Sequence, residues 1–161
     1  MRRIVILLIL CVIATGFCFG QLPHTFTQYT SEDGLSQNTI MSILQDDKGV
    51  MWFATWDGLY KFDGYTFNNY KAHPGDSIGL SNNRLDNIKE DRYGYIWVQS
   101  YNHQVYRFNP RLERFQAIPY DNYLSLDMYV LPCGDVWIIT VQNELIHIST
   151  HPETHEMKAT D

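Results

Sequence analysis

Few residues of this 161-residue chain have the spacing that catalysis or metal binding requires. His151 and His155 are four residues apart, as two metal ligands on a helix are, but Pro152 lies between them and places both in a turn. Glu32-Asp33 and Glu90-Asp91 could supply the two carboxylates of a glycosidase, yet both pairs are local to turns. We therefore predict no catalytic residues, no metal and no cofactor, and a chain that is not an enzyme.

A larger set of residues combines aromatic rings with amides and a carboxylate, which suits the binding of a sugar. Aromatic rings stack on the CH faces of a sugar, and amides bond to its hydroxyls. Trp56 is the strongest candidate, because a tryptophan in a turn has no evident packing role. The alternative is that Asn and Asp only satisfy the turns in which they lie. The candidate ligand-binding residues are Trp56, Asp57, Tyr101, Asn102, His103, Gln142, Asn143, Asn82 and Arg84.

An internal repeat indicates how these residues are positioned. A Gly-x-x-Trp unit occurs three times, first at a shift of 45 residues and then at a shift of 40. Leu35-Ser36-Gln37-Asn38 also recurs, as Leu80-Ser81-Asn82-Asn83. Repeats of this length are typical of propellers and solenoids. The repeated structural residues are Gly49 and Trp52, Gly94 and Trp97, and Gly134 and Trp137.

Each unit has the pattern of four short antiparallel strands. In the first unit, alternating residues predict strands over 39–45, 51–55, 59–62 and 65–70, with turns rich in Gly and Asp between them. Four strands in about 45 residues form the blade of a β-propeller. We therefore predict an all-β fold, a partial β-propeller of three four-stranded antiparallel blades. The three tryptophans are expected to fill the gaps between blades.

The repeat divides the chain into five segments. Residues 1–20 are predicted to be a signal peptide, and residues 21–34 an outer closing strand and a lead-in loop, because Phe26-Thr27-Gln28-Tyr29 resembles the outer strand ending at Tyr70. Blade repeats are predicted over 35–79, 80–119 and 120–161. The third repeat is expected to be incomplete, with Asp161 in the turn before its fourth strand. Because four or more blades are needed to close a ring, the ring is expected to be incomplete as well.

The first residues and the charge balance suggest where the protein acts. Met1-Arg2-Arg3 precedes an apolar run, and small residues at Cys18 and Gly20 suit cleavage after Gly20. An uncleaved anchor and lipidation at Cys18 are the alternatives. After cleavage, 10 basic and 18 acidic residues give a net charge of −8, which argues against nucleic acid as a partner. Cys133 is then the one remaining cysteine, so no disulfide framework is expected.

The residues of the first unit resemble a known family. Gly34-Leu35-Ser36-x-Asn38, the segment from Ile43 to Thr55 and the segment from Asp57 to Gly64 are similar to the two-component regulator propeller repeat. The resemblance fades in the third unit. It implies the periplasmic, ligand-sensing part of a hybrid two-component sensor that regulates polysaccharide use, with its kinase part absent from this chain.

The resemblance also implies partners. The full-length sensor is expected to be anchored in the inner membrane, to bind an oligosaccharide, to contain further blades and to form a homodimer. In a propeller, the loops joining second to third strands share one face with the loops leading into each blade, and the candidate ligand-binding residues collect there. A fragment of a secreted propeller glycoside hydrolase or lyase, and a non-catalytic adhesion scaffold, are the alternatives.

Overall fold

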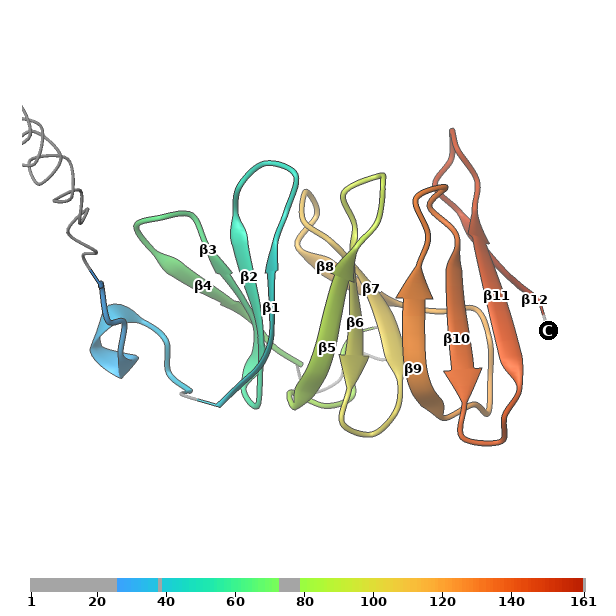
Figure 1. Ribbon diagram of the computed structural model, residues 1–161, viewed down its shortest axis with the longest axis horizontal. Helices are drawn as coiled ribbons and strands as arrows, with labels where there is room; N and C mark the ends of the chain where they lie inside the picture. The colour runs from blue at the N-terminus through green and yellow to red at the C-terminus, as the bar shows by residue number, and fades with distance from the viewer. Residues whose placement is uncertain (1–25, 38, 73–78, 161) are drawn as a thin grey trace, which may run out of the picture.

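The computed structural model describes residues 26–37, 39–72 and 79–160, which form three four-stranded antiparallel sheets side by side (Figure 1). The predicted signal peptide, with Cys18, lies outside the described residues. Within the described residues no helix has the length and apolar character needed to cross a membrane. The prediction of an all-β partial propeller with three blades is confirmed.

Each blade is an antiparallel meander, in which strands adjacent in sequence pair with one another. The first blade consists of β1 (Ile40–Gln45), β2 (Met51–Thr55), β3 (Gly58–Phe62) and β4 (Phe67–Tyr70). The second consists of β5 (Leu85–Glu90), β6 (Ile96–Ser100), β7 (Val105–Asn109) and β8 (Arg114–Ala117). The third consists of β9 (Ser125–Val130), β10 (Val136–Thr140), β11 (Leu145–Thr150) and β12 (Met157–Thr160).

The repeated glycines and tryptophans occupy equivalent positions in the three blades. Gly49, Gly94 and Gly134 end the first hairpin turn of each blade with φ values of 83°, 79° and 95°, a backbone conformation that favours glycine. Three residues later, each tryptophan lies on the second strand, opposite Lys61, Arg107 and His147 of the third strands respectively. The sequence repeat is therefore a structural repeat.

The core lies between the blades, because each sheet buries its faces against its neighbours. Trp52 packs into the interface of the first and second blades, where its ring centroid is 5.7 Å from that of Phe108. Trp97 is buried in the interface of the second and third blades. Trp137, at the equivalent position of the third blade, is half-buried and stacks on His147 with ring centroids 4.5 Å apart. The predicted packing role holds for Trp52 and Trp97, while no described blade covers Trp137.

Two sequence-based expectations are wrong at the edges of the repeat. The third blade has a fourth strand, although the sequence predicted none. In this blade β12 pairs with β11, with His147 opposite Thr160 at one end and Thr150 opposite Met157 at the other. The chain reverses within residues 151–156, where His155 takes a left-handed conformation with φ 59°, so the strand begins earlier than the sequence indicated.

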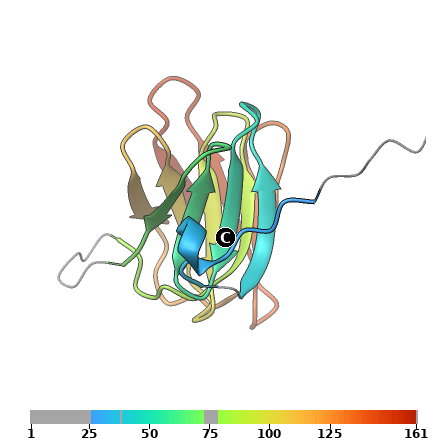
Figure 2. The ribbon, with the colours of Figure 1, turned by 90° about the vertical axis from the view of Figure 1, so that its left-hand side faces the viewer.

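Residues 26–30 do not form the predicted outer strand. A strand requires an edge to pair with, and Phe26–Tyr29 makes no strand pairing with the described sheets. The Tyr29 ring instead packs against Phe62 and Phe67 of the first blade, with ring centroids 4.9 and 5.5 Å away. The short 3-10 helix η1 (Ser31–Asp33) follows, beside the first blade in Figure 2. The lead-in segment therefore covers the first blade.

Candidate ligand-binding face

The loops between second and third strands meet the loops that lead into the next blade at one edge of the molecule. Backbone hydrogen bonds join them: Gly58 N–H donates to Asn83 O at 2.9 Å, Tyr101 N–H to Arg84 O at 2.8 Å, and Ser125 N–H to His103 O at 2.8 Å. We call this edge, the lower one in Figure 1, the tip face. The shared face expected for propeller loops is present, although Asn38 of the first lead-in loop lies outside the described residues.

Three of the candidate residues form one cluster on the tip face. The Arg84 guanidinium carbon lies 4.2 Å from the Trp56 ring centroid and 3.9 Å from that of Tyr101, so the cation is flanked by rings of two blades. Asn82 holds the loop, because its Oδ1 accepts the Arg84 N–H at 2.9 Å. Trp56 and Tyr101 remain 41% and 52% exposed. The cluster is therefore built from both blades and open to solvent.

Arg84 makes no ion pair with a carboxylate among the described residues, and its buried Nε has no hydrogen-bond partner. Flat contact with aromatic rings orders a guanidinium without using its hydrogen-bond donors. The guanidinium therefore has donors to offer a ligand.

Asp57 lies beside this cluster but is engaged within the first blade. Its Oδ2 accepts hydrogen bonds from Lys71 Nζ at 2.6 Å and from Ser36 Oγ at 2.8 Å. Burial raises the pKa of Asp57, but the bonds from Lys71 and Ser36 outweigh that effect and hold the pKa below its ordinary value. Asp57 is thus an ionised anchor for the tip.

The remaining candidates lie in the turns between second and third strands of the second and third blades, and two of them bond to a lead-in loop. Asn102 donates from Nδ2 to Ser81 Oγ at 3.0 Å, and His103, at φ 64°, places Nδ1 2.9 Å from Ser125 O. Asn143 has φ 63° and donates its N–H to Thr140 O at 3.0 Å, next to the exposed Gln142. Gln142 and Asn143 have no described contact with the Trp56–Arg84–Tyr101 cluster. The structure thus brings Trp56, Arg84 and Tyr101 together. Asn102 and His103 lie in the same turn as Tyr101, while Gln142 and Asn143 lie in the corresponding turn of the third blade.

Sequence reasoning missed an aspartate that binds the buried tryptophan in two blades. Asp46 Oδ2 accepts the Trp52 Nε1–H at 2.9 Å, and Asp91 Oδ2 accepts that of Trp97 at 2.8 Å. The signal was an aspartate six residues before the tryptophan in both units; the third unit has Leu131 at that position. A pocket at the opposite edge, around Tyr93 and Tyr95, was also missed.

The two acidic pairs considered for catalysis have structural roles. Asp91 is 3% exposed and is bonded to Trp97 and to backbone N–H groups. Asp33 Oδ2 accepts the Thr30 N–H at 2.7 Å and caps η1. His151 Nδ1 accepts the N–H groups of Glu153 and Thr154 within the β11–β12 turn, so the predicted turn is confirmed. Among the described residues no group of His, Cys, Asp and Glu side chains could hold a metal ion.

Comparison with known proteins identifies the repeat. Residues 34–57 match the family described as Two component regulator propeller. The chain carries a two-component regulator propeller repeat. A stretch of 56 residues is 48% identical to Histidine kinase P4 of Formosa agariphila, covering 35% of this chain and 4% of that protein. The match spans only a small part of the length of that histidine kinase.

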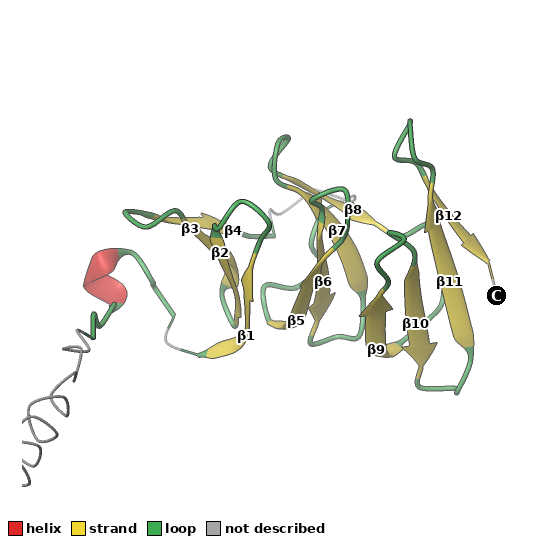
Figure 3. Cartoon of the chain, turned by 45° about the horizontal axis from the view of Figure 1, so that its top comes forward, coloured by secondary structure: helices red, strands yellow, loops and turns green. Residues whose placement is uncertain are grey.

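Solved structures share the fold of three neighbouring four-stranded sheets (Figure 3). One is a protein described as the extracellular domain of the hybrid two component system BT3049 from B. thetaiotaomicron. It has a TM-score of 0.65 and 24% identity, over 84% of this chain and 20% of that one. The domain described in the same way for BT4673 of that organism has a TM-score of 0.58 and 20% identity, over 73% of this chain and 17% of that one. The likeness shows that the three sheets are propeller blades.

Proposed function

We propose that this chain is part of the periplasmic sensor region of a two-component system and binds an oligosaccharide on its tip face. The observation that carries the proposal is the Arg84 cation flanked by Trp56 and Tyr101 at the junction of two blades. Three likenesses support it: that of residues 34–57 to the two-component regulator propeller, that of a 56-residue stretch to a histidine kinase, and that of the fold to extracellular domains of two-component systems.

The cluster offers both kinds of contact that a sugar needs. The exposed parts of Trp56 and Tyr101 provide apolar surface for CH groups, and the guanidinium provides donors for hydroxyl oxygens. Because the two rings belong to different blades, a ligand there contacts both blades at once. The ligand would therefore bind more tightly to one relative position of the blades than to others. Such a difference in affinity between conformations is what signalling requires.

The proposed role is non-catalytic. The acidic pairs that a glycoside hydrolase would need for catalysis are engaged in structural hydrogen bonds, and Asp57 is ion-paired with Lys71. An adhesion scaffold would need no preorganised cation. The sensor proposal accounts for Arg84 better than either alternative.

Titration of plant and host glycan fragments into the full chain by calorimetry tests the proposal. Trp56→Ala should weaken binding about tenfold, the equivalent of roughly 1.4 kcal/mol, because the ligand and Arg84 each lose their contact with the Trp56 ring. Tyr65→Ala is the control, since Tyr65 is fully exposed in a turn at the opposite edge. Absence of binding to every fragment, or equal loss in both variants, would contradict the proposal.

A further inference from the structure

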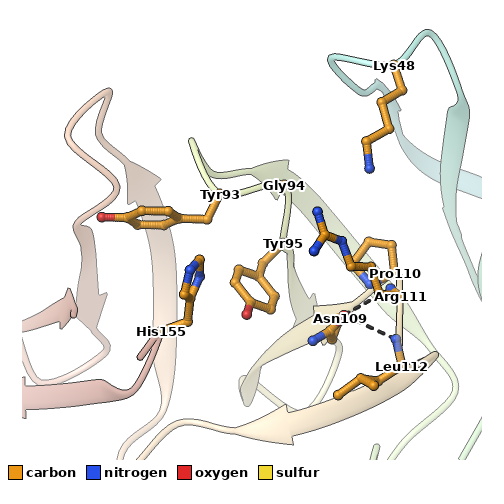
Figure 4. Close-up of a pocket in the computed structure, with 9 residues that line it drawn as sticks. All are labelled: Lys48, Tyr93, Gly94, Tyr95, Asn109, Pro110, Arg111, Leu112 and His155. Atoms are coloured by element: carbon orange, nitrogen blue, oxygen red, sulfur yellow. Dashed lines mark hydrogen bonds between the residues drawn. The ribbon is translucent and has the colours of Figure 1, made fainter. Parts of the chain in front are cut away.

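A pocket opens at the edge opposite the tip face. Its volume is about 330 Å³, near the lower end of the range for small-molecule sites. Turns of all three blades line it, as Figure 4 shows. The lining residues are Lys48, Tyr93, Gly94, Tyr95, Asn109, Pro110, Arg111, Leu112 and His155. Its size fits one sugar ring with its substituents.

The two charged side chains that line the pocket are both basic. Lys48 and Arg111 extend into the same space from different blades in Figure 4, and none of the lining residues is acidic. Neither side chain takes part in an ion pair or side-chain hydrogen bond with a described residue. Two like charges on one cavity repel each other, and an anion between them would remove that repulsion. Carboxylates lie just outside this lining, because Glu90 Oε2 accepts the N–H of Asp47, the neighbour of Lys48.

A buried arginine behind the pocket adds to this charge. Arg107 is 4% exposed and lies over Tyr95, with its guanidinium carbon 4.3 Å from the ring centroid. Its Nη2 donates to Gln116 Oε1 and to His155 O, but its Nη1 is buried without a partner. Burial lowers the pKa of Arg107, while the charges of Tyr95 and Asp91 partly oppose this effect. Arg107 forms no ion pair with a described carboxylate.

Aromatic rings and amides complete the lining. The Tyr93 and Tyr95 rings contact the His155 ring edge to face, with centroids 4.9 and 5.7 Å away, and form one wall. His155 Nδ1 is buried without a hydrogen-bond partner. Asn109 Oδ1 accepts the Arg111 and Leu112 N–H groups at 2.9 and 3.2 Å, which fixes the turn that carries Arg111. The pocket therefore combines an aromatic wall with two exposed cations held on ordered turns.

We propose that this pocket binds an acidic sugar, with the carboxylate or sulfate group between Lys48 and Arg111 and the ring against Tyr93 and Tyr95. Guanidinium and ammonium groups bind such anions through charge-assisted hydrogen bonds, and tyrosine rings pack on sugar CH groups. The site is separate from the tip face, so it stands or falls independently of the function proposed above.

Calorimetric titration of the full chain with glucuronic acid and galactose 6-sulfate tests the site, with glucose, galactose and inorganic sulfate as comparisons. We expect the acidic sugars to bind at least tenfold more tightly than their neutral parents. Arg111→Gln and Lys48→Gln should each weaken this binding about tenfold or more. Arg114→Gln is the matched control, because Arg114 is exposed on the same blade and does not line the pocket. It should leave binding unchanged.

The outcomes separate this site from the tip face. Trp56→Ala should leave acidic-sugar binding intact, and Arg111→Gln should leave oligosaccharide binding at the tip face intact. Equal affinity for acidic and neutral sugars, or no binding, would overturn the proposal, as would equal loss in Arg114→Gln. Inorganic sulfate binding as tightly as galactose 6-sulfate would identify a simple anion site and overturn the assignment of a sugar.

Discussion

An aspartate organises the first hairpin turn of each of the first two blades, half-buried as Asp46 and buried as Asp91. In the second blade, Asp91 Oδ1 accepts the N–H groups of Tyr93 and Tyr95 at 2.9 and 3.1 Å, while Oδ2 accepts the Trp97 Nε1–H. One carboxylate thus satisfies three donors and ties the turn to the tryptophan that fills the space between blades. The third blade has no such carboxylate, because Leu131 stands at that position.

Asp91→Ala should destabilise the chain by about 3 kcal/mol, because it leaves three donors, including a buried indole N–H, without their acceptor. The free energy of unfolding from urea denaturation, followed by circular dichroism, measures the loss. Asp121→Ala is the control, since Asp121 is exposed in a loop and has no described partner. A loss below about 0.5 kcal/mol for Asp91→Ala, the range of a neutral surface change, would contradict this role.

At the level of single residues, the sequence indicated which turns carry the candidate site but not how their side chains meet. The register of the repeat was enough to place Trp56 and Tyr101 at equivalent tips. Arg84 fits between them because of side-chain torsions and the spacing of two sheets, which no pattern within one strand encodes. The same limit applies to the opposite pocket, where Lys48, Arg111 and His155 come from three different blades.

At the level of secondary structure, the strands followed from local signals. Gly-x-x-Trp marks a turn and the strand after it, so the first two blades were predicted with four strands each. The errors lie where those signals stop. Met157–Thr160 alternates too briefly to be recognised, and Phe26–Tyr29 resembles a strand but has no described edge to pair with.

The blade interface should be the main source of stability. Phe108 is fully buried between Trp52, Tyr70 and Phe115, with the Tyr70 and Phe115 ring centroids each 4.7 Å away. Phe108→Ala removes the contacts of this ring with both the first and the second blade. We expect the free energy of unfolding to fall by about 3–5 kcal/mol. Urea denaturation measures this fall, with Phe26→Ala as the control because the Phe26 side chain is 92% exposed. Equal midpoints for the two variants would contradict the role of the blade interface.

At the level of the whole molecule, the outer face of the third blade exposes apolar surface. Tyr129, Trp137 and His147 lie opposite one another across three strands, and Tyr129 is 55% exposed. In the first two blades the equivalent tryptophan faces the following sheet. Trp137 has no such cover among the described residues.

We therefore expect the 161-residue chain to self-associate through this face, because exposed apolar patches favour association. Sedimentation velocity over a concentration series measures it. Tyr129→Lys should shift the chain toward monomer, and Tyr65→Lys, a matched change on a distant turn, should not. A monomer at every concentration would rule out this association.

The backbone hydrogen bonds at the tip face have a mechanical consequence. The N–H groups of Gly58 and Tyr101 donate to the lead-in loop of the second blade, and the Ser125 N–H donates to His103 O in the second tip, so neither tip can tilt without displacing its neighbour. A deformation introduced at one tip would pass from sheet to sheet, and proton exchange at these three amides should slow in concert when one tip is occupied.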